Sequence, residues 1–441
     1  MPVNQLASEV SQRFRKGVSW SVAGGLVASL VNFSLGVCIA RIIGKQEFGE
    51  FAIISNTLTA VAGVAQLAVG YTTTKYLSEY RSVDKCKAGR IIGFCAIVAN
   101  ATALFGTVFV IAGADWLTVA MLGQPQLRAK LLFSSGLVFF TVLNGFQTGI
   151  LAGLERYQDL AKTTALAAIC NIMVCVAAVL IGGQMGAVIS LPIGACIQWI
   201  LFRRVVAKAI DDEKIKIIYE GAHQERRIFT RFTLPAAASG FFALPVLWLA
   251  NSFLVQQKDG VSQMAIFAAA NTLRTIVTIV PTILNKVTMS MMNHERGRTN
   301  HSSYRSIFKL NLFSGALLAT VAALGLATVG PYLLGTYGAS FRSGYGVLTV
   351  LLAVAVLEVV CQCIYQLVQS SEKLWHSLFL VVIPRDLTIA IIAWLYVPTM
   401  GAMGLAVSYA IGWSLALIAV IGISIKNDLF TNLTHANCRK T

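Results

Sequence analysis

The chain has 441 residues, of which 56% are hydrophobic and only 12% are charged. Soluble domains carry about 45–50% apolar and about 25% charged residues, so this composition excludes a soluble globular protein. A membrane-spanning helix needs about 20 residues, and a chain of this length therefore holds roughly a dozen spans and no large extramembrane catalytic domain. The net charge of +16 would suggest nucleic-acid binding in a soluble protein, but in a membrane protein it first reports loop orientation.

Twelve apolar stretches follow one another along the chain. Each is predicted to be a helix, because backbone groups in lipid must be satisfied within the segment and no stretch alternates like a barrel strand. The first six are 18–40, 51–71, 91–112, 131–153, 163–182 and 186–202, and the second six are 232–255, 264–291, 310–334, 345–370, 377–397 and 401–425. The predicted fold class is an all-α integral membrane protein with 12 transmembrane helices.

The basic residues predict the orientation of these spans. With a cytoplasmic N-terminus, 26 of the 35 Lys and Arg residues fall in the inner segments, six fall in outer loops and three lie within spans. Basic residues concentrate on the cytoplasmic side of membrane proteins, so both termini are predicted to be cytoplasmic. The apolar stretch after Arg13, Arg15 and Lys16 is longer than a signal-peptide core and is predicted to be a retained first span.

An internal repeat divides the chain into two halves. Asn56-Thr57-Leu58 matches Asn271-Thr272-Leu273, and Met185-Gly186-Ala187 matches Met400-Gly401-Ala402, both at an offset of 215 residues. We therefore expect two pseudo-symmetric six-helix lobes of the same orientation, with the substrate path between them. The predicted boundaries are an amphipathic N-terminus (1–17), an N-lobe (18–202), a cytoplasmic linker (203–231), a C-lobe (232–425) and a cytoplasmic tail (426–441).

Ionisable side chains inside the spans are the candidate functional residues, because each is costly to place in lipid. The C-lobe holds Arg274, Lys286, Glu358, Arg385 and Asp386, whereas the N-lobe spans hold no ionisable group at mid-depth. The five charges sum to +1, and guanidinium groups suit phosphate because their planar donors bind it in a bidentate way. The predicted substrate-binding residues are Arg274, Lys286, Arg385 and Asn271, and the predicted coupling or charge-pairing residues are Glu358 and Asp386.

Structural alternatives exist for each of these charged residues. Arg274 could be neutralised by Glu358 as a buried pair, and Lys286 could extend to the inner interface. Arg385 and Asp386 lie about 100° apart on one helix, so they could pair or diverge. Pro384, just before them, permits a bend.

Neither a catalytic centre nor a cofactor or metal site is predicted. Cys361 and Cys363 are two residues apart and point about 200° apart on a helix, so we interpret them as small apolar fillers. The five His residues lack ligand spacing, and no nucleotide-binding or hydrolase motif occurs. An ATP-driven pump is therefore not indicated.

Several short motifs resemble one family. They are Ala40-Arg41-x-x-Gly44-x-x-x-Phe48-Gly49, the segment 70–80, the segment Leu151 to Tyr157, and the segment Met400 to Ala406. In order and topology they are similar to the polysaccharide flippases, the Wzx-type O-antigen translocases, within the multidrug/oligosaccharidyl-lipid/polysaccharide exporter superfamily.

The resemblance implies a multi-pass protein of the bacterial inner membrane that moves an undecaprenyl-diphosphate-linked oligosaccharide, such as an O-antigen or lipopolysaccharide repeat unit, to the outer leaflet by alternating access. It implies a central cationic cavity, onto which Arg274, Lys286 and Arg385 map by position. Implied partners are membrane lipids, the polysaccharide polymerase and the chain-length machinery; nucleic acid is not expected. No bond is made, so an enzyme is not expected.

Three other functions fit the sequence less well. A cation-coupled multidrug exporter of the same superfamily should keep a membrane carboxylate in the first lobe, and a major-facilitator carrier should carry G-x-x-x-D-x-x-G-R-R in 74–90; neither pattern is present. A membrane glycan polymerase or ligase needs a large outer loop, whereas the longest predicted one is 113–130. The sequence leaves the driving force of transport open. It could be a proton carried by Glu358 or Asp386, or the removal of product outside.

Overall fold

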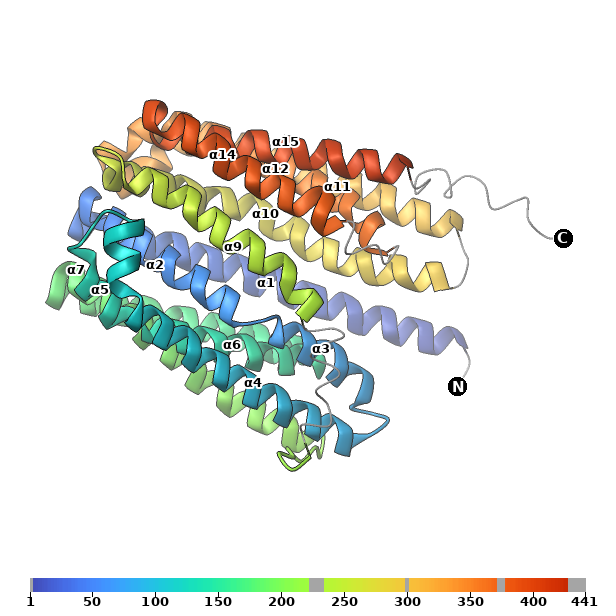
Figure 1. Cartoon of the computed structure of the whole chain (residues 1–441). Coiled ribbons are helices and arrows are strands. Elements are labelled where there is room, and N and C mark those ends of the chain that lie inside the picture. The colour runs from blue at the N-terminus through green and yellow to red at the C-terminus, as the bar shows by residue number, and fades with distance from the viewer. Residues whose placement is uncertain (1–2, 222–233, 298–300, 371–376, 427–441) are drawn as a thin grey trace. The chain divides into compact units, whose positions relative to one another are not determined.

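The computed structural model describes residues 3–221, 234–297, 301–370 and 377–426 (Figure 1). Within these ranges the chain is helical and no strand occurs. The chain divides into two compact units, Met1–Ala265 and Ile266–Thr441, and each is described by itself. The all-α prediction is confirmed.

The first unit is built from long helices joined by short corners. They are α1 (Val3–Ile43), α2 (Lys45–Ala65), α3 (Val69–Tyr80), α4 (Lys85–Ala112), a short π-helix (Trp116–Met121), α5 (Leu127–Ser134), α6 (Gly136–Gly153), α7 (Tyr157–Asp212) and α9 (Leu234–Val255). Helix α6 packs against α3, α4 and α7, and α1 packs along α7. The buried cluster of this unit lies around Leu77, Ile91, Leu151 and Phe202.

The second unit begins within α10 (Gly260–Gly297), the helix that carries Arg274. It continues through α11 (His301–Tyr337), a 3-10 helix (Ala339–Gly344), α12 (Tyr345–Ser370), a short π-helix (Leu378–Val382), α14 (Ile383–Met400) and α15 (Ala402–Lys426). Helix α15 packs against both α12 and α14. This arrangement packs α15 against α12, which carries Glu358, and against α14, which carries Arg385 and Asp386.

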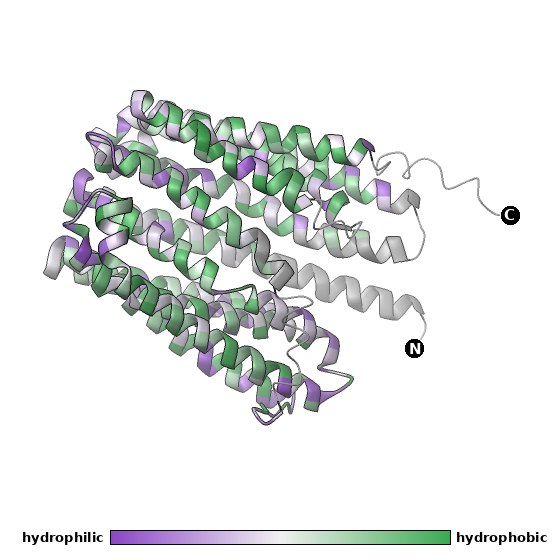
Figure 2. Ribbon diagram, viewed as in Figure 1, coloured by the Kyte–Doolittle hydropathy of each residue, from purple (hydrophilic) through white to green (hydrophobic). Residues whose placement is uncertain are grey.

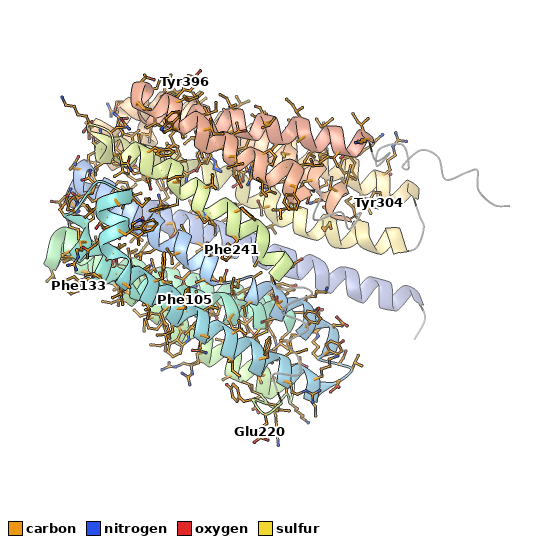
Figure 3. The ribbon with its side chains drawn as sticks, viewed as in Figure 1. Phe105, Phe133, Glu220, Phe241, Tyr304 and Tyr396 are labelled. Atoms are coloured by element: carbon orange, nitrogen blue, oxygen red, sulfur yellow. The ribbon has the colours of Figure 1, made fainter. Side chains whose placement is uncertain are left out.

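The described residues contain ten helical segments long and apolar enough to cross a membrane. One of them, α7, holds two helices merged across non-helical Gly183, and Gly240–Val255 is a further, shorter apolar helix. Counting these separately gives the twelve spans that the sequence predicts. Hydrophobic residues run along the helices and hydrophilic ones gather at their ends (Figure 2). Large apolar side chains face outward, as at Phe105 and Phe133, which are 73% and 62% exposed (Figure 3).

Corners with left-handed backbone reveal the internal repeat in the structure. Gly44 before α2 (φ 85°) and Asp259 before α10 (φ 63°) are 215 residues apart, as the repeat predicts. At the last corner of each half, Gly183 (φ 54°, ψ −132°) and Gly401 (φ 56°, ψ −132°) share one conformation at an offset of 218. The structure therefore pairs Met185-Gly186 with Met403-Gly404, three residues beyond the tripeptide match at Met400. The lobe boundaries predicted from the repeat remain a prediction.

The second span is broken rather than continuous. Leu67 (φ 43°) and Ala68 (φ 53°) adopt the left-handed conformation, which ends α2 and starts α3. In a continuous helix the Val69 N–H would donate to Ala65, but here it donates to Gln66 O at 2.8 Å. At the repeat offset of 215, Gln66 corresponds to Pro281 inside α10, a residue that removes one helical hydrogen bond. The first half thus breaks the helix at this point, whereas the second half keeps a continuous helix with a proline at the equivalent position.

After this break, α3 lies in backbone contact with α6. A Cβ atom on Gly149 would lie 2.3 Å from Gly70 O, and one on Gly70 would lie 2.4 Å from Gly145 O. Thr74 Oγ1 bridges the two helices by donating to Gly70 O at 2.9 Å and to Gly149 O at 3.0 Å. Small residues allow this approach, as they do at close helix interfaces in membranes generally.

Candidate substrate site

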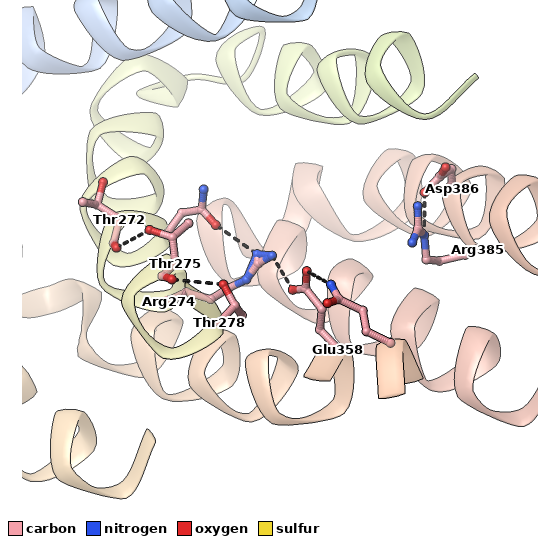
Figure 4. Close-up of polar contacts among 9 residues, drawn as sticks. Thr272, Arg274, Thr275, Thr278, Glu358, Arg385 and Asp386 are labelled. Carbon is pink, nitrogen blue, oxygen red and sulfur yellow. Dashed lines mark hydrogen bonds and ion pairs between the residues drawn. The ribbon is translucent and has the colours of Figure 1, made fainter. Parts of the chain in front are cut away.

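Arg274 and Glu358 form a largely buried ion pair between α10 and α12. Arg274 Nη2 donates to Glu358 Oε2 at 2.7 Å, and the two side chains are 11% and 14% exposed. Asn271, one turn before Arg274, accepts a longer bond from Nη1 at 3.3 Å. Gln362 Nε2 donates to the other carboxylate oxygen, Glu358 Oε1, at 3.1 Å (Figure 4). The predicted alternative of pairing is therefore what the structure shows for Arg274, and its binding role stays a prediction.

Arg385 and Asp386 pair with each other within α14. Arg385 Nε donates to Asp386 Oδ1 at 2.7 Å, so the adjacent side chains converge (Figure 4). Asp386 is 1% exposed, and its second oxygen, Oδ2, has no hydrogen-bond partner among the described residues. Pro384 lies in the first turn of α14, where a missing N–H costs no helical bond. The sequence could not decide between pairing and divergence here; the structure shows pairing.

Two aromatic residues of α15 lie beneath the two arginines, and sequence analysis missed both. The Arg274 guanidinium carbon lies 5.8 Å from the Tyr409 ring centroid, and that of Arg385 lies 4.4 Å from the Trp413 centroid. Tyr409 and Trp413 are four residues apart, so they share one face of α15. Tyr409 also lies within electrostatic range of Glu358 and Asp386. The i, i+4 spacing of these two aromatic residues is visible in the sequence, but the sequence does not show that arginines lie against them.

The charge balance of this site depends on Lys286. The four described charges cancel as two pairs, so the predicted excess of +1 comes from Lys286 alone. Its backbone lies in α10, but its side chain lies outside the described residues. Thr275 and Thr278 follow Arg274 on α10, and each donates its hydroxyl to the backbone carbonyl three residues earlier (Figure 4).

A second polar cluster, uncharged and buried, joins α10, α11 and α12. Asn311 Nδ2 donates to Asn285 Oδ1 at 2.8 Å, Thr288 Oγ1 donates to Asn311 Oδ1 at 3.1 Å, and Gln366 Nε2 donates to Asn285 O at 2.8 Å. Cys363 contacts the same amide, with Sγ 3.3 Å from Asn285 Oδ1. This network fixes three helices to one another, and it gives Cys363 a polar neighbour that the filler interpretation did not predict.

The first unit also contains a buried charged cluster, formed by residues of α2, α5 and the corner of α7 beside Gly183. Lys130 Nζ pairs with the Glu50 carboxylate, and Gln184 bonds to both, donating to Glu50 Oε2 and accepting from Lys130, each at 2.6 Å. The helices that carry Glu50 and Lys130 begin earlier than the predicted spans, at Lys45 and Leu127, so both residues lie within helices. Sequence analysis did not predict this cluster.

Replacing Lys130 with methionine is expected to destabilise the protein more than replacing Arg128. Lys130 and Glu50 are only 18% and 12% exposed, so the variant leaves a buried carboxylate unpaired, at a cost of up to about 3–5 kcal/mol. Arg128 pairs with Asp115 at the surface, where such pairs contribute about 0–1 kcal/mol. Thermal unfolding of the purified variants in detergent measures the difference. Adding Glu50→Gln to Lys130→Met should recover part of the loss, and equal melting temperatures for Lys130→Met and Arg128→Met would contradict the burial argument.

The fold resembles that of solved transporters. An inward-facing multidrug resistance MATE family transporter of the MOP superfamily matches with a TM-score of 0.78 and 14% identity over 93% of this chain and 96% of that one. A MOP superfamily transporter from Pyrococcus furiosus matches with a TM-score of 0.73 and 16% identity over 96% and 97%. At these identities the likeness shows the fold alone, and it confirms the predicted superfamily architecture.

Two curated relatives match part of the chain. Both are described as EPS I polysaccharide export inner membrane protein EpsE, one from Ralstonia nicotianae (23% identical over 154 residues) and one from Ralstonia solanacearum (22% over 184 residues). The matches cover 35% and 42% of this chain and 35% and 41% of the relatives. The chain thus spans less than half the length of the curated relatives it matches.

The family assignment rests on a longer match. Residues 14–294, which include α2, α7 and the Arg274 segment of α10, match the family described as polysaccharide biosynthesis protein. This range exceeds half of the 441 residues, and the family agrees with the resemblance inferred from the short motifs. The chain is an integral membrane protein that belongs to the polysaccharide biosynthesis protein family and has the fold of the MOP superfamily transporters.

Proposed function

We propose that this protein is a flippase of the bacterial inner membrane that moves an undecaprenyl-diphosphate-linked oligosaccharide from the cytoplasmic to the periplasmic leaflet by alternating access. The observation that carries the proposal is the pair of arginines, Arg274 and Arg385, buried among membrane-spanning helices in a member of a polysaccharide biosynthesis family. Charged groups in spans are costly and line functional paths. The relatives described as export proteins support the same direction of transport.

The chemistry of the site fits a diphosphate. Arginine binds phosphate through planar donors, and a diphosphate offers oxygens to two guanidinium groups at once. Arg274 would meet the substrate by giving up one of its present contacts to Glu358 or Asn271, and Lys286 would supply the net positive charge. The released carboxylate of Glu358, or that of Asp386, would then be free to take a proton and couple transport. No bond in the substrate breaks, so the protein acts as a transporter and hands the lipid-linked unit to the polymerase and chain-length machinery.

A cation-coupled multidrug exporter is the second candidate, favoured by the MATE family likeness of the fold. Such a protein should carry a membrane carboxylate in its first half, and Glu50 is a buried carboxylate there. However, Glu50 Oε2 accepts hydrogen bonds from both Lys130 and Gln184, so this oxygen could take up a proton only by breaking the cluster. The flippase therefore remains the function that the charged residues support best.

Depletion of the protein in its host tests the proposal. We expect lipid-linked single repeat units to accumulate on the inner leaflet, because synthesis continues while transfer stops. Leaflet position is measured by the access of a membrane-impermeant glycan-cleaving enzyme to intact spheroplasts and to inverted vesicles. Accumulation on the outer leaflet would instead mark a polymerase, and normal polysaccharide with raised drug sensitivity would mark an exporter.

A further inference from the structure

The two arginines of the candidate site are not equivalent. In Arg274, both terminal nitrogens are engaged, Nη2 by Glu358 and Nη1 by Asn271. In Arg385, only Nε is engaged, by Asp386 Oδ1 at 2.7 Å. Among the described residues, Nη1 and Nη2 of Arg385 have no hydrogen-bond or ion-pair partner, although the side chain is only 16% exposed. A guanidinium carries five N–H donors, and four of them are therefore available on Arg385.

Two contacts hold the Arg385 guanidinium in place. Its carbon lies 4.4 Å from the centroid of the Trp413 ring, which is within the range of a cation–π contact. Asp386 is fully buried, at 1% exposed, and bonds the guanidinium on its Nε side. One contact covers a face of the guanidinium plane and the other takes one edge, so the edge formed by Nη1 and Nη2 is left for a ligand. Because Trp413 lies on α15 and Arg385 on α14, the packing of these two helices sets the geometry.

We propose that Nη1 and Nη2 of Arg385 make the bidentate contact to the diphosphate of the transported lipid, and that Trp413 and Asp386 are positioning residues for this contact. This inference rests on the proposed function, and it identifies the side chain that first contacts the diphosphate of the substrate. Two parallel N–H donors match two oxygens of one phosphate group. The buried carboxylate explains how an arginine without a complete set of partners is tolerated at this depth, since it neutralises the charge without occupying the donors that a phosphate needs.

The order of contacts follows from this difference. A phosphate on the Nη1–Nη2 edge of Arg385 meets two nitrogens without a protein partner among the described residues, whereas on Arg274 both of these nitrogens already bond Asn271 and Glu358. Arg385 therefore binds first, and Arg274 engages the second phosphate afterwards. Tyr409, one turn from Trp413 on α15, lies within electrostatic range of both arginines, which places the two contacts on neighbouring turns of one helix.

Binding of farnesyl diphosphate to the purified full-length protein in detergent tests the proposal. Farnesyl monophosphate and phosphatidylglycerol serve as the comparison lipids, since each offers a single phosphate. We expect the diphosphate to bind at least tenfold more tightly than either. Arg385→Lys keeps the charge but loses the two parallel N–H donors. It should weaken diphosphate binding at least tenfold with little change in the melting temperature of the unliganded protein. Trp413→Phe keeps a ring and should bind within about threefold of the parent, whereas Trp413→Leu should resemble Arg385→Lys.

Arg203→Lys is the matched control, because Arg203 lies 5.1 Å over the Trp199 ring at the end of α7, far along the chain from the site. It should leave diphosphate binding unchanged. Undiminished binding by Arg385→Lys would overturn the assignment while leaving the flippase proposal, which the leaflet measurement tests independently. Equal binding of phosphatidylglycerol and the diphosphate would reduce the site to a general lipid-phosphate contact and also overturn it. A Trp413→Leu variant that binds like the parent would remove Trp413 from the positioning role.

Discussion

Arg274→Ala is expected to abolish display of surface polysaccharide in cells that make only this variant. If Arg274 holds one phosphate of the substrate, its loss removes charge-assisted hydrogen bonds that no neighbour replaces. The same change, however, leaves Glu358 as an unpaired carboxylate at 14% exposure. Breaking a buried pair in this way costs about 3–5 kcal/mol, so loss of display by the single variant alone would not separate transport from folding.

A double replacement separates the two effects. Removing both charges with apolar residues of similar volume, as in Arg274→Met with Glu358→Leu, is often neutral for stability because no charge is left unpaired. We expect this double variant to recover the membrane abundance and melting temperature of the parent while polysaccharide display stays absent. Immunoblotting of membranes and staining of surface polysaccharide measure the two outcomes. Recovery of display together with stability would show that the Arg274–Glu358 pair is purely structural.

Gly149→Leu is expected to prevent the first unit from folding. Even the Cβ atom of a new side chain would lie 2.3 Å from Gly70 O, which is a backbone atom of α3, and α3 packs along α6. Overpacking of a core costs about 1–3 kcal/mol when side chains can move aside, and here the obstruction is backbone. Gly149→Ala tests the same contact more mildly and should lower the melting temperature measured by fluorescence-detected size-exclusion chromatography.

The control for this prediction is Gly325→Ala in α11. No atom lies within 4 Å of the position a Cβ would take there. Alanine favours a helix over glycine by roughly 0.5–1 kcal/mol, so Gly325→Ala should be neutral or slightly stabilising. If the two alanine variants melted alike, the close approach of α3 and α6 would not be what holds these helices together.

Hydropathy predicted the helices well, and the reason is physical. Lipid offers backbone groups no hydrogen-bond partner, so a long apolar stretch has one stable conformation and can be recognised from composition alone. The limits of each helix were less well predicted, because polar residues continue a helix beyond the lipid. Helix α2 begins at Lys45 instead of Phe51 for this reason, which placed Glu50 outside the predicted span.

The break in the second span could not be predicted. Gln66, Leu67 and Ala68 include neither glycine nor proline, and a left-handed backbone at such residues is set by packing against α6 and not by local preference. Its counterpart in α10, Pro281, is plain in the sequence. The proline is thus visible where the helix continues, and no local signal is visible where the helix breaks.

For the candidate site, the sequence predicted the charged residues but not their partners. Their cost in lipid made Arg274, Glu358, Arg385 and Asp386 conspicuous wherever they fell. The pairing of Arg274 with Glu358 joins residues 84 apart in the chain, and the stacking of Arg385 on Trp413 depends on how α14 meets α15. Tyr409 and Trp413 look like ordinary aromatic residues of a span until the helices are placed.

The glycine corners bear on the history of the chain. Gly183 and Gly401 share one backbone conformation, and the corners at Gly44 and Asp259 both have positive φ, yet the spacing between partners grows from 215 to 218 residues. Duplication of an ancestral six-helix gene leaves such a pattern, and the changed spacing locates a net insertion of three codons, or an equal deletion from the first copy, between the second and fifth spans. The conformation of the Gly183 and Gly401 corners is the same in both halves, whereas the buried ion pairs differ: the first unit holds Glu50 with Lys130, and the second holds Arg274 with Glu358 and Arg385 with Asp386. The two copies have therefore kept the backbone of this corner while their buried charges diverged.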